Sequence, residues 1–88
     1  METEHLMHRC GREIILFLFE NRPPQYATTV YKETNITYSH ITETIKVMVK
    51  AGIIEKKELD GRTNGLFLTE KGKKIAESLR FIKKTLEE

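Results

Sequence analysis

The stretch that most constrains the fold of this chain is residues 36–52, with the sequence ITYSHITETIKVMVKAG. Apolar side chains recur in it at spacings of four, three and one residues. This rhythm predicts an amphipathic helix, because such spacings place side chains on one side of a helix. The predicted buried stripe consists of Ile41, Ile45, Met48 and Val49.

Signals for both helix ends flank this stretch. Thr37 precedes the periodic run and could cap its free N–H groups, and Gly52 follows it and suits the left-handed position after a helix. The opposite face is polar and rich in hydroxyl groups, with the side chains of Tyr38, Ser39, Thr42, Glu43 and Lys46. Such a face could contact base edges in a DNA groove, or it could be only the solvated side of a helix. The flanking sequence must decide between these interpretations.

A first helix is expected over residues 3–21. Its segment 14–19 is apolar on every side, which indicates burial between other elements or against a partner. Pro23 and Pro24 end this helix, because proline disfavours helix at its own position and at the preceding one.

A second, shorter helix is expected after the two prolines. Residues 25–27 could be extended and pair as a short strand, and Thr28 could then cap a helix that ends near Thr34. Asn35 tolerates a left-handed backbone and would supply a tight turn. Two short helices joined by such a turn form a helix-turn-helix.

The periodicity then changes from that of a helix to that of a hairpin. Residues 53–59 are expected to form one strand, and residues 66–68 a second, short one. The sequence between them, DGRTNG, contains two turn dipeptides, of which Asn64-Gly65 is the second. We therefore expect a hairpin whose tip is DGRTNG.

A last helix is expected to begin after Thr69, which could cap it. Its apolar residues recur at spacings of four, three and four, as in a coiled coil. The alternative is that this stripe packs on the chain's own first helix. Because a domain of this size buries a small core, we favour a homodimer. The candidate interface residues are Leu6, Ile75, Leu79, Ile82 and Leu86.

The predicted fold class is mainly α with a small β-hairpin (α+β). The expected order is helix, short strand, helix, helix, strand, strand, helix, which is the order of a winged helix. We expect a single domain over residues 1–88. Within it, the helix-turn-helix would cover about 28–52, the wing hairpin about 53–68, and the C-terminal dimerisation helix about 69–87.

Residues 28–72 resemble the winged helix-turn-helix domains of MarR-like and related prokaryotic regulators. The matching features are the apolar rhythm of ITYSHITETIKVMVKAGII, the wing tip DGR, and LTEKG at the start of the last helix. The phrase Asn35-Ile36-Thr37-Tyr38 is also similar to small archaeal winged-helix transcriptional regulators and chromatin proteins. The resemblance implies binding of double-stranded DNA.

The sequence departs from the MarR-like pattern in two places. Tyr31 stands where a small residue is usual in the second helix, and Thr34 replaces a common apolar residue. The predicted recognition helix also lacks arginine, which is the commonest partner of guanine.

The expected contacts follow from how a helix-turn-helix docks on DNA. Side chains near the start of the recognition helix would meet base edges, the second helix would hold phosphate, and Arg62 at the wing tip would enter the minor groove. The alternatives are a face without a partner or with a protein partner, and an arginine that is only a solubilising turn residue. The candidate DNA-binding residues are Thr28, Thr29, Thr37, Tyr38, Ser39, His40, Thr42, Lys46, Lys56, Lys57, Arg62, Thr63 and Asn64.

Composition sets looser limits. The net charge of +2 permits a nucleic-acid partner without requiring one, and the single cysteine excludes an internal disulfide framework. No apolar run is long enough to span a membrane, so we expect a cytoplasmic protein with no membrane partner. No catalytic or phosphate-binding motif is present, so we expect neither an enzyme nor a cofactor.

Three residues near the N-terminus raise the question of a metal or thiol sensor. His5 and His8 could share a helical face, but Cys10 points away from His8 on the same helix. Two ligands do not close a metal site, so no metal is expected.

Taken together, these features predict a homodimeric, sequence-specific transcriptional regulator. Two alternatives remain open. One is an architectural chromatin protein with low sequence specificity, and the other is a winged-helix module that binds protein.

Overall fold

The computed structural model describes residues 8–59, 61 and 63–88, with only the backbone of residue 63. This part contains four α-helices and a two-stranded antiparallel hairpin. Their order confirms the predicted α+β fold class and winged-helix arrangement. The elements are α2 (Arg9–Glu20), α3 (Ala27–Glu33), α4 (Tyr38–Lys50), β1 (Ile54–Leu59), β2 (Thr63–Leu68) and α5 (Glu70–Leu86).

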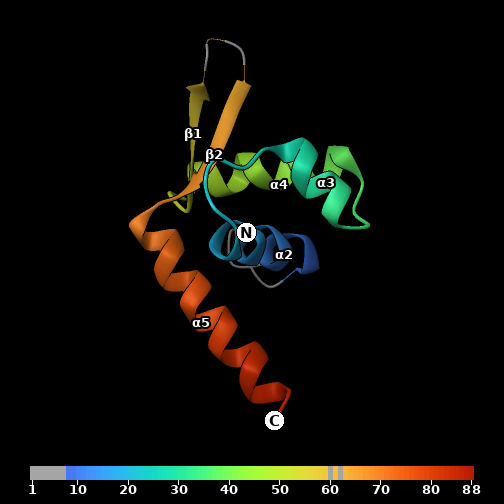
Figure 1. The fold of residues 1–88 in the computed structure, drawn as a ribbon, viewed down its shortest axis with the longest axis vertical. Coiled ribbons are helices and arrows are strands. Elements are labelled where there is room, and N and C mark those ends of the chain that lie inside the picture. The colour runs from blue at the N-terminus through green and yellow to red at the C-terminus, as the bar shows by residue number, and fades with distance from the viewer. Residues whose placement is uncertain (1–7, 60, 62) are drawn as a thin grey trace.

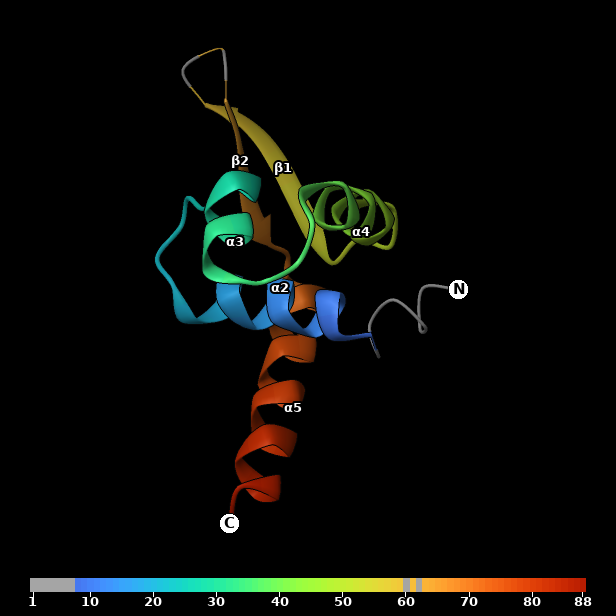
Figure 2. The same ribbon diagram turned by 90° about the vertical axis from the view of Figure 1, so that its right-hand side faces the viewer.

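The hairpin and α5 extend toward opposite ends of the molecule, with the other helices between them (Figure 1). The turned view shows the C-terminal half of α5 projecting beyond α2 (Figure 2). Every element contributes to one apolar core. Its largest fully buried apolar side chains are those of Ile14, Ile15, Val30, Ile41, Ile45, Met48, Ile53 and Ile54.

Helix α2 lies below α3 and α4 in Figure 1 and is buried on more than one side, as its all-round apolar sequence predicts. Ile14 and Ile15 are fully buried, and Phe17 and Phe19 pack against the core from the flanks. The helix begins at Arg9, and His8 before it is extended, so the prediction of one continuous helix from residue 3 to residue 21 is wrong at residue 8. Leu6 and the expected cap at residue 3 lie outside the described residues.

Helix α3 begins two residues earlier than expected, at Ala27. Its N-cap is Tyr26, so Thr28 lies inside the first turn and the prediction that it caps the helix is wrong. The expected short strand is confirmed as a single bridge, in which the N–H of Leu66 donates to the carbonyl of Gln25 at 2.7 Å.

The buried face of α4 differs from the prediction at one position. Ile41, Ile45 and Met48 are buried as expected, but Val49 is 36% exposed. Thr44 takes the fourth core position and is 1% exposed. Its hydroxyl donates to the carbonyl of His40 at 2.8 Å, which allows a polar side chain to enter the core.

The capping prediction is wrong at the start of α4 and confirmed at its end. Thr37 is at the N-cap position, but its side chain makes no capping hydrogen bond. At the other end Gly52 has a φ of 77°, as predicted. The N–H groups of Gly52 and Ile53 donate to the carbonyls of Val49 and Met48, at 3.1 and 2.9 Å. This pair of bonds is the Schellman arrangement, which turns the chain sharply into the hairpin.

The hairpin is longer than expected because β2 begins at Thr63. Its pairing runs from Ile54 opposite Leu68 to Leu59 opposite Thr63. The prediction of a turn at Asn64-Gly65 is therefore wrong, since both residues lie in β2.

Gly65 serves packing rather than a turn. A side chain there would meet Leu59 Cδ1 at 2.7 Å, Phe67 Cε1 at 3.1 Å and Pro24 Cβ at 3.2 Å.

Helix α5 starts at the residue predicted, and its start is joined to the end of α4. The Thr69 hydroxyl accepts from the N–H of Gly72 at 3.0 Å and lies 3.1 Å from the carbonyl of Ile53. Lys71 Nζ donates to the carbonyl of Ala51, the C-cap of α4, at 2.9 Å.

The apolar stripe of α5 is divided along its length. Ile75 and Leu79 pack against the core of the same chain, which is the alternative considered for the whole stripe. Ile82 and Leu86 lie beyond that core and are 52% and 80% exposed.

Candidate nucleic-acid interface

Three elements meet at a cleft of about 270 Å³. Helix α3 contributes its first turn, α4 contributes one side, and the hairpin closes the third wall. We call this space the α3–α4–wing cleft. It is lined by Tyr26, Ala27, Thr28, Tyr38, Thr42, Ile45, Lys46, Lys56, Asn64 and Leu66.

The α4 residues reach the cleft together because of their spacing. Tyr38, Thr42 and Lys46 are four residues apart, so they lie one above another on one side of the helix. Ile45 anchors the same side to the core. The sequence prediction thus places on one wall three of the side chains that the structure brings together.

Lys46 and Lys56 enter the cleft from different elements. Both are exposed, and neither takes part in an ion pair with another described residue. The Thr28 hydroxyl and the Asn64 amide line the same concave space. Together with the two cations they form a surface suited to a phosphodiester strand.

Strand alternation separates the two predicted wing lysines. Lys56 faces the cleft, whereas Lys57 lies on the other face of β1, because successive side chains of a strand point to opposite sides. Lys57 Nζ is 3.6 Å from Glu55 Oε1 and 5.4 Å from the centroid of the Phe67 ring.

The other six predicted residues either flank the cleft or are not described at the level of the side chain. Ser39 and His40 are exposed in the first turn of α4 and Thr37 is exposed at its N-cap, while Thr29 is half-buried in α3. Arg62 lies outside the described residues, as does the side chain of residue 63.

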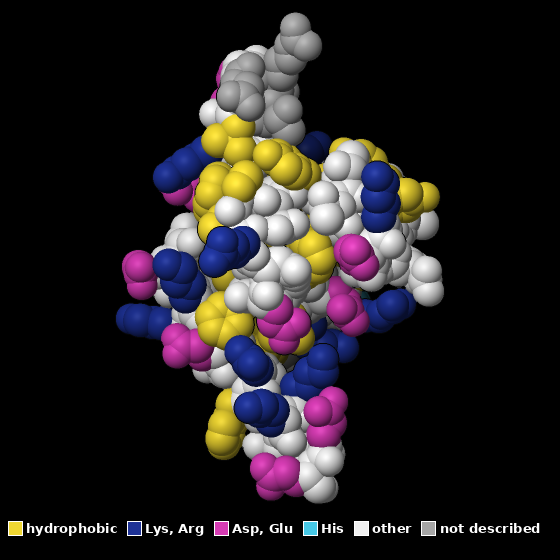
Figure 3. Space-filling view, viewed as in Figure 1, with side chains coloured by type: hydrophobic (Ala, Val, Ile, Leu, Met, Phe, Trp, Pro, Cys, Tyr) yellow, Lys and Arg dark blue, Asp and Glu magenta, His cyan; other side chains and the backbone are white. Residues whose placement is uncertain are grey.

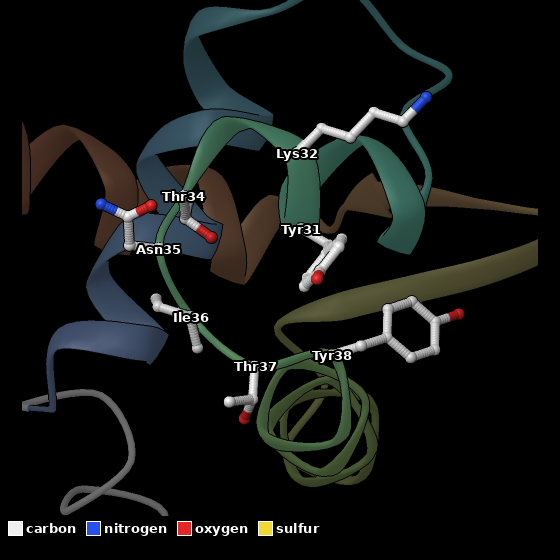
Figure 4. Close-up of a pocket in the computed structure, with 7 residues that line it drawn as sticks. All are labelled: Tyr31, Lys32, Thr34, Asn35, Ile36, Thr37 and Tyr38. Carbon is white, nitrogen blue, oxygen red and sulfur yellow. The ribbon is translucent and has the colours of Figure 1, made fainter.

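Tyr31 is absent from the predicted set, yet it lies against a residue that belongs to it. Its ring stands edge-on to that of Tyr38, with the centroids 6.0 Å apart and the planes at 87°. Figure 4 shows the Tyr31 ring pointing from α3 toward the start of α4, where the Tyr38 ring extends outward from the helix. The available sequence signal was a pair of aromatic residues seven positions apart across the turn.

The described residues contain no group of three or more His, Cys, Asp or Glu side chains placed to hold a metal ion. Among the same residues, no helix combines the length and apolar character needed to cross a membrane.

Comparisons with known proteins agree with this architecture. The chain is similar over its whole length to AF1382 from Archaeoglobus fulgidus, with 26% identity, a TM-score of 0.85 and coverage of 99% of that chain. It is similar to the adhesin competence repressor AdcR from Streptococcus pyogenes, with 26% identity and a TM-score of 0.77 over 96% of this chain and 62% of that one.

The transcriptional repressor BigR from Xylella fastidiosa shares the fold at 18% identity, with a TM-score of 0.78 over 99% of this chain and 84% of that one. A search of curated proteins gives no significant match. Residues 9–87 match the sequence model of the winged helix-turn-helix family. The chain therefore belongs to the winged helix-turn-helix family.

Proposed function

We propose that this protein is a sequence-specific, DNA-binding transcriptional regulator that acts as a homodimer. Helix α4 enters the major groove, and the hairpin lies at the minor groove. The observation that carries the proposal is the α3–α4–wing cleft, in which Lys46 and Lys56 converge from two elements. Similar folds occur in proteins named as repressors, AdcR and BigR, and family membership agrees with a non-enzymatic role.

The cleft separates two kinds of contact. Lys46, Lys56 and Thr28 would hold one phosphate strand, with Thr29 and Asn64 beside it. The exposed first turn of α4, including Ser39 and His40, would then lie over base edges. Phosphate contacts fix the position of a protein on DNA, and base contacts choose the sequence.

The decisive measurement is fluorescence anisotropy with labelled duplex DNA over a range of salt concentrations. Lys46→Ala and Lys56→Ala should each weaken binding and reduce the slope of log affinity against log salt by about 0.9. Lys74→Ala on α5 is the matched control, since it removes one exposed charge away from the cleft. Unchanged slopes in both cleft variants would reject the assigned DNA surface.

Sequence specificity needs a separate experiment. Selection from random duplexes at two salt concentrations should enrich one motif at both. Retention of all duplexes alike would identify the architectural chromatin alternative instead, and retention of none at low salt would favour a protein-binding module.

The homodimer is proposed from the exposed part of α5. A groove of about 360 Å³ lies between α2, the end of α3 and α5, and it carries both acidic and basic side chains. Figure 3 shows charges of both signs and hydrophobic side chains on the projecting end of α5. A surface with both signs can pair with a copy of itself about a two-fold axis. The apolar residues that line the groove are Leu16, Phe17, Leu79, Ile82 and Leu86.

A further inference from the structure

We propose that the start of α4 recognises A·T pairs through the methyl group of thymine. The contact surface would be the ring pair of Tyr31 and Tyr38, extended by the methyl group of Thr42. This inference rests on the proposed function, because it requires α4 to lie in the major groove.

The residue types of α4 limit how it can recognise bases. Its sequence, YSHITETIKVMVK, contains no arginine, asparagine or glutamine. These are the side chains that most often make paired hydrogen bonds to guanine or adenine. Of its two lysines, Lys46 lies in the cleft beside Lys56, and Lys50 is in the last turn. The first turn therefore lacks the usual bidentate groups.

Two hydroxyl groups of α4 already donate hydrogen bonds within the helix, so they are not free to donate to a base. Thr42 Oγ1 donates to the carbonyl of Ser39 at 3.0 Å, and Thr44 is buried with its hydroxyl bonded to the carbonyl of His40. The hydrogen of Thr42 is thus used within the helix. What Thr42 still presents to a base is its methyl group and an acceptor oxygen.

The tyrosine pair supplies a larger apolar surface at the same end. Tyr31 and Tyr38 are 49% and 45% exposed, although each ring packs against the other. Figure 4 shows the Tyr38 ring extending away from the axis of α4. Rings held in this way present contact area with little loss of side-chain freedom on binding.

Thymine has the complementary chemistry. In the major groove it alone of the four bases carries a methyl group, and apolar side chains are its recognised partners. The flanking cations Lys46 and Lys56 match the phosphate strand on the same side. The occupant that fits this surface is therefore a duplex with thymine under the first turn of α4.

The test changes only the methyl group. Binding of the full chain is measured by anisotropy to an A·T-rich duplex and to the same duplex with uracil in place of thymine. Loss of the methyl should weaken binding roughly three- to fivefold for each methyl contacted. In a G·C-rich duplex, 5-methylcytosine in place of cytosine supplies a methyl at the same ring position and should strengthen binding.

Protein variants assign the effect to the ring pair. Tyr38→Phe and Tyr31→Phe keep the rings and should preserve the preference for thymine over uracil. Tyr38→Ala should abolish most of it, and Tyr31→Ala should reduce it by releasing the Tyr38 ring. Lys56→Ala is the control, because it should weaken binding to both duplexes by the same factor.

The outcomes separate this inference from the proposed function. Equal affinity of the parent for the thymine and uracil duplexes overturns the inference and leaves DNA binding standing. A thymine preference that survives Tyr38→Ala also overturns it, because the methyl contact would then lie elsewhere. Failure to bind any duplex at low salt overturns both.

Discussion

Gly72 is a residue at which α5 packs closely against the backbone that follows α4. A side chain there would collide with the backbone carbonyl of Ile53, which cannot rotate away. We expect Gly72→Ala to lower the free energy of unfolding by about 1–3 kcal/mol, measured by urea denaturation. Gly65→Ala is the comparison, since most of its neighbours are movable side-chain atoms and its cost should be smaller. Equal costs would contradict this account of Gly72.

Thr44 supports a prediction of a small effect on stability. Its buried hydroxyl bonds to the carbonyl of His40, which also accepts the backbone hydrogen bond of the helix. Thr44→Val therefore leaves no polar atom without a partner and should change the unfolding free energy by less than about 1 kcal/mol. Thr44→Ala removes packing as well and should cost more. A thermal denaturation series checks the order.

At the scale of elements, Thr69 links the start of α5 to the turn after α4. Its hydroxyl caps α5 and also lies against the carbonyls of Gly52 and Ile53. Thr69→Val keeps the shape but loses these bonds, so we expect a loss of about 1–2 kcal/mol. Thr69→Ser keeps the hydroxyl and should lose much less. Urea unfolding with both variants distinguishes the role of the bonds from that of the methyl group.

At the scale of the whole molecule, the exposed end of α5 is the surface through which we propose that two copies associate. Ile82→Asp together with Leu86→Asp should convert the proposed dimer into monomers, because two charges would enter an apolar contact. Leu79 is unsuitable for this test, since it packs on the core of its own chain. Sedimentation velocity gives the oligomeric state, with Lys84→Asp on the opposite side of α5 as the control. A parent protein that sediments as a monomer would end the dimer proposal.

Local sequence was sufficient to predict the order of elements. A change from helical to strand periodicity, a proline pair, a glycine after α4 and a threonine before α5 each act through the backbone of a few neighbouring residues. For this reason the helix ends at Gly52 and Thr69 were predicted correctly. The same reasoning placed Tyr38, Thr42 and Lys46 on one side of a helix.

Contacts between segments far apart in the sequence decided which residues pack together and which stay exposed. Gly65 lies in β2 opposite Lys57, where Pro24 leaves little room for a side chain. Tyr31 matters because the turn between α3 and α4 brings its ring against that of Tyr38. The division of α5 into a core half and an exposed half depends on where α5 passes α2 and projects beyond it (Figure 2). Propensity and periodicity act over a few residues, so they determine the elements. Which side chains share a cleft depends on packing, which no single segment contains.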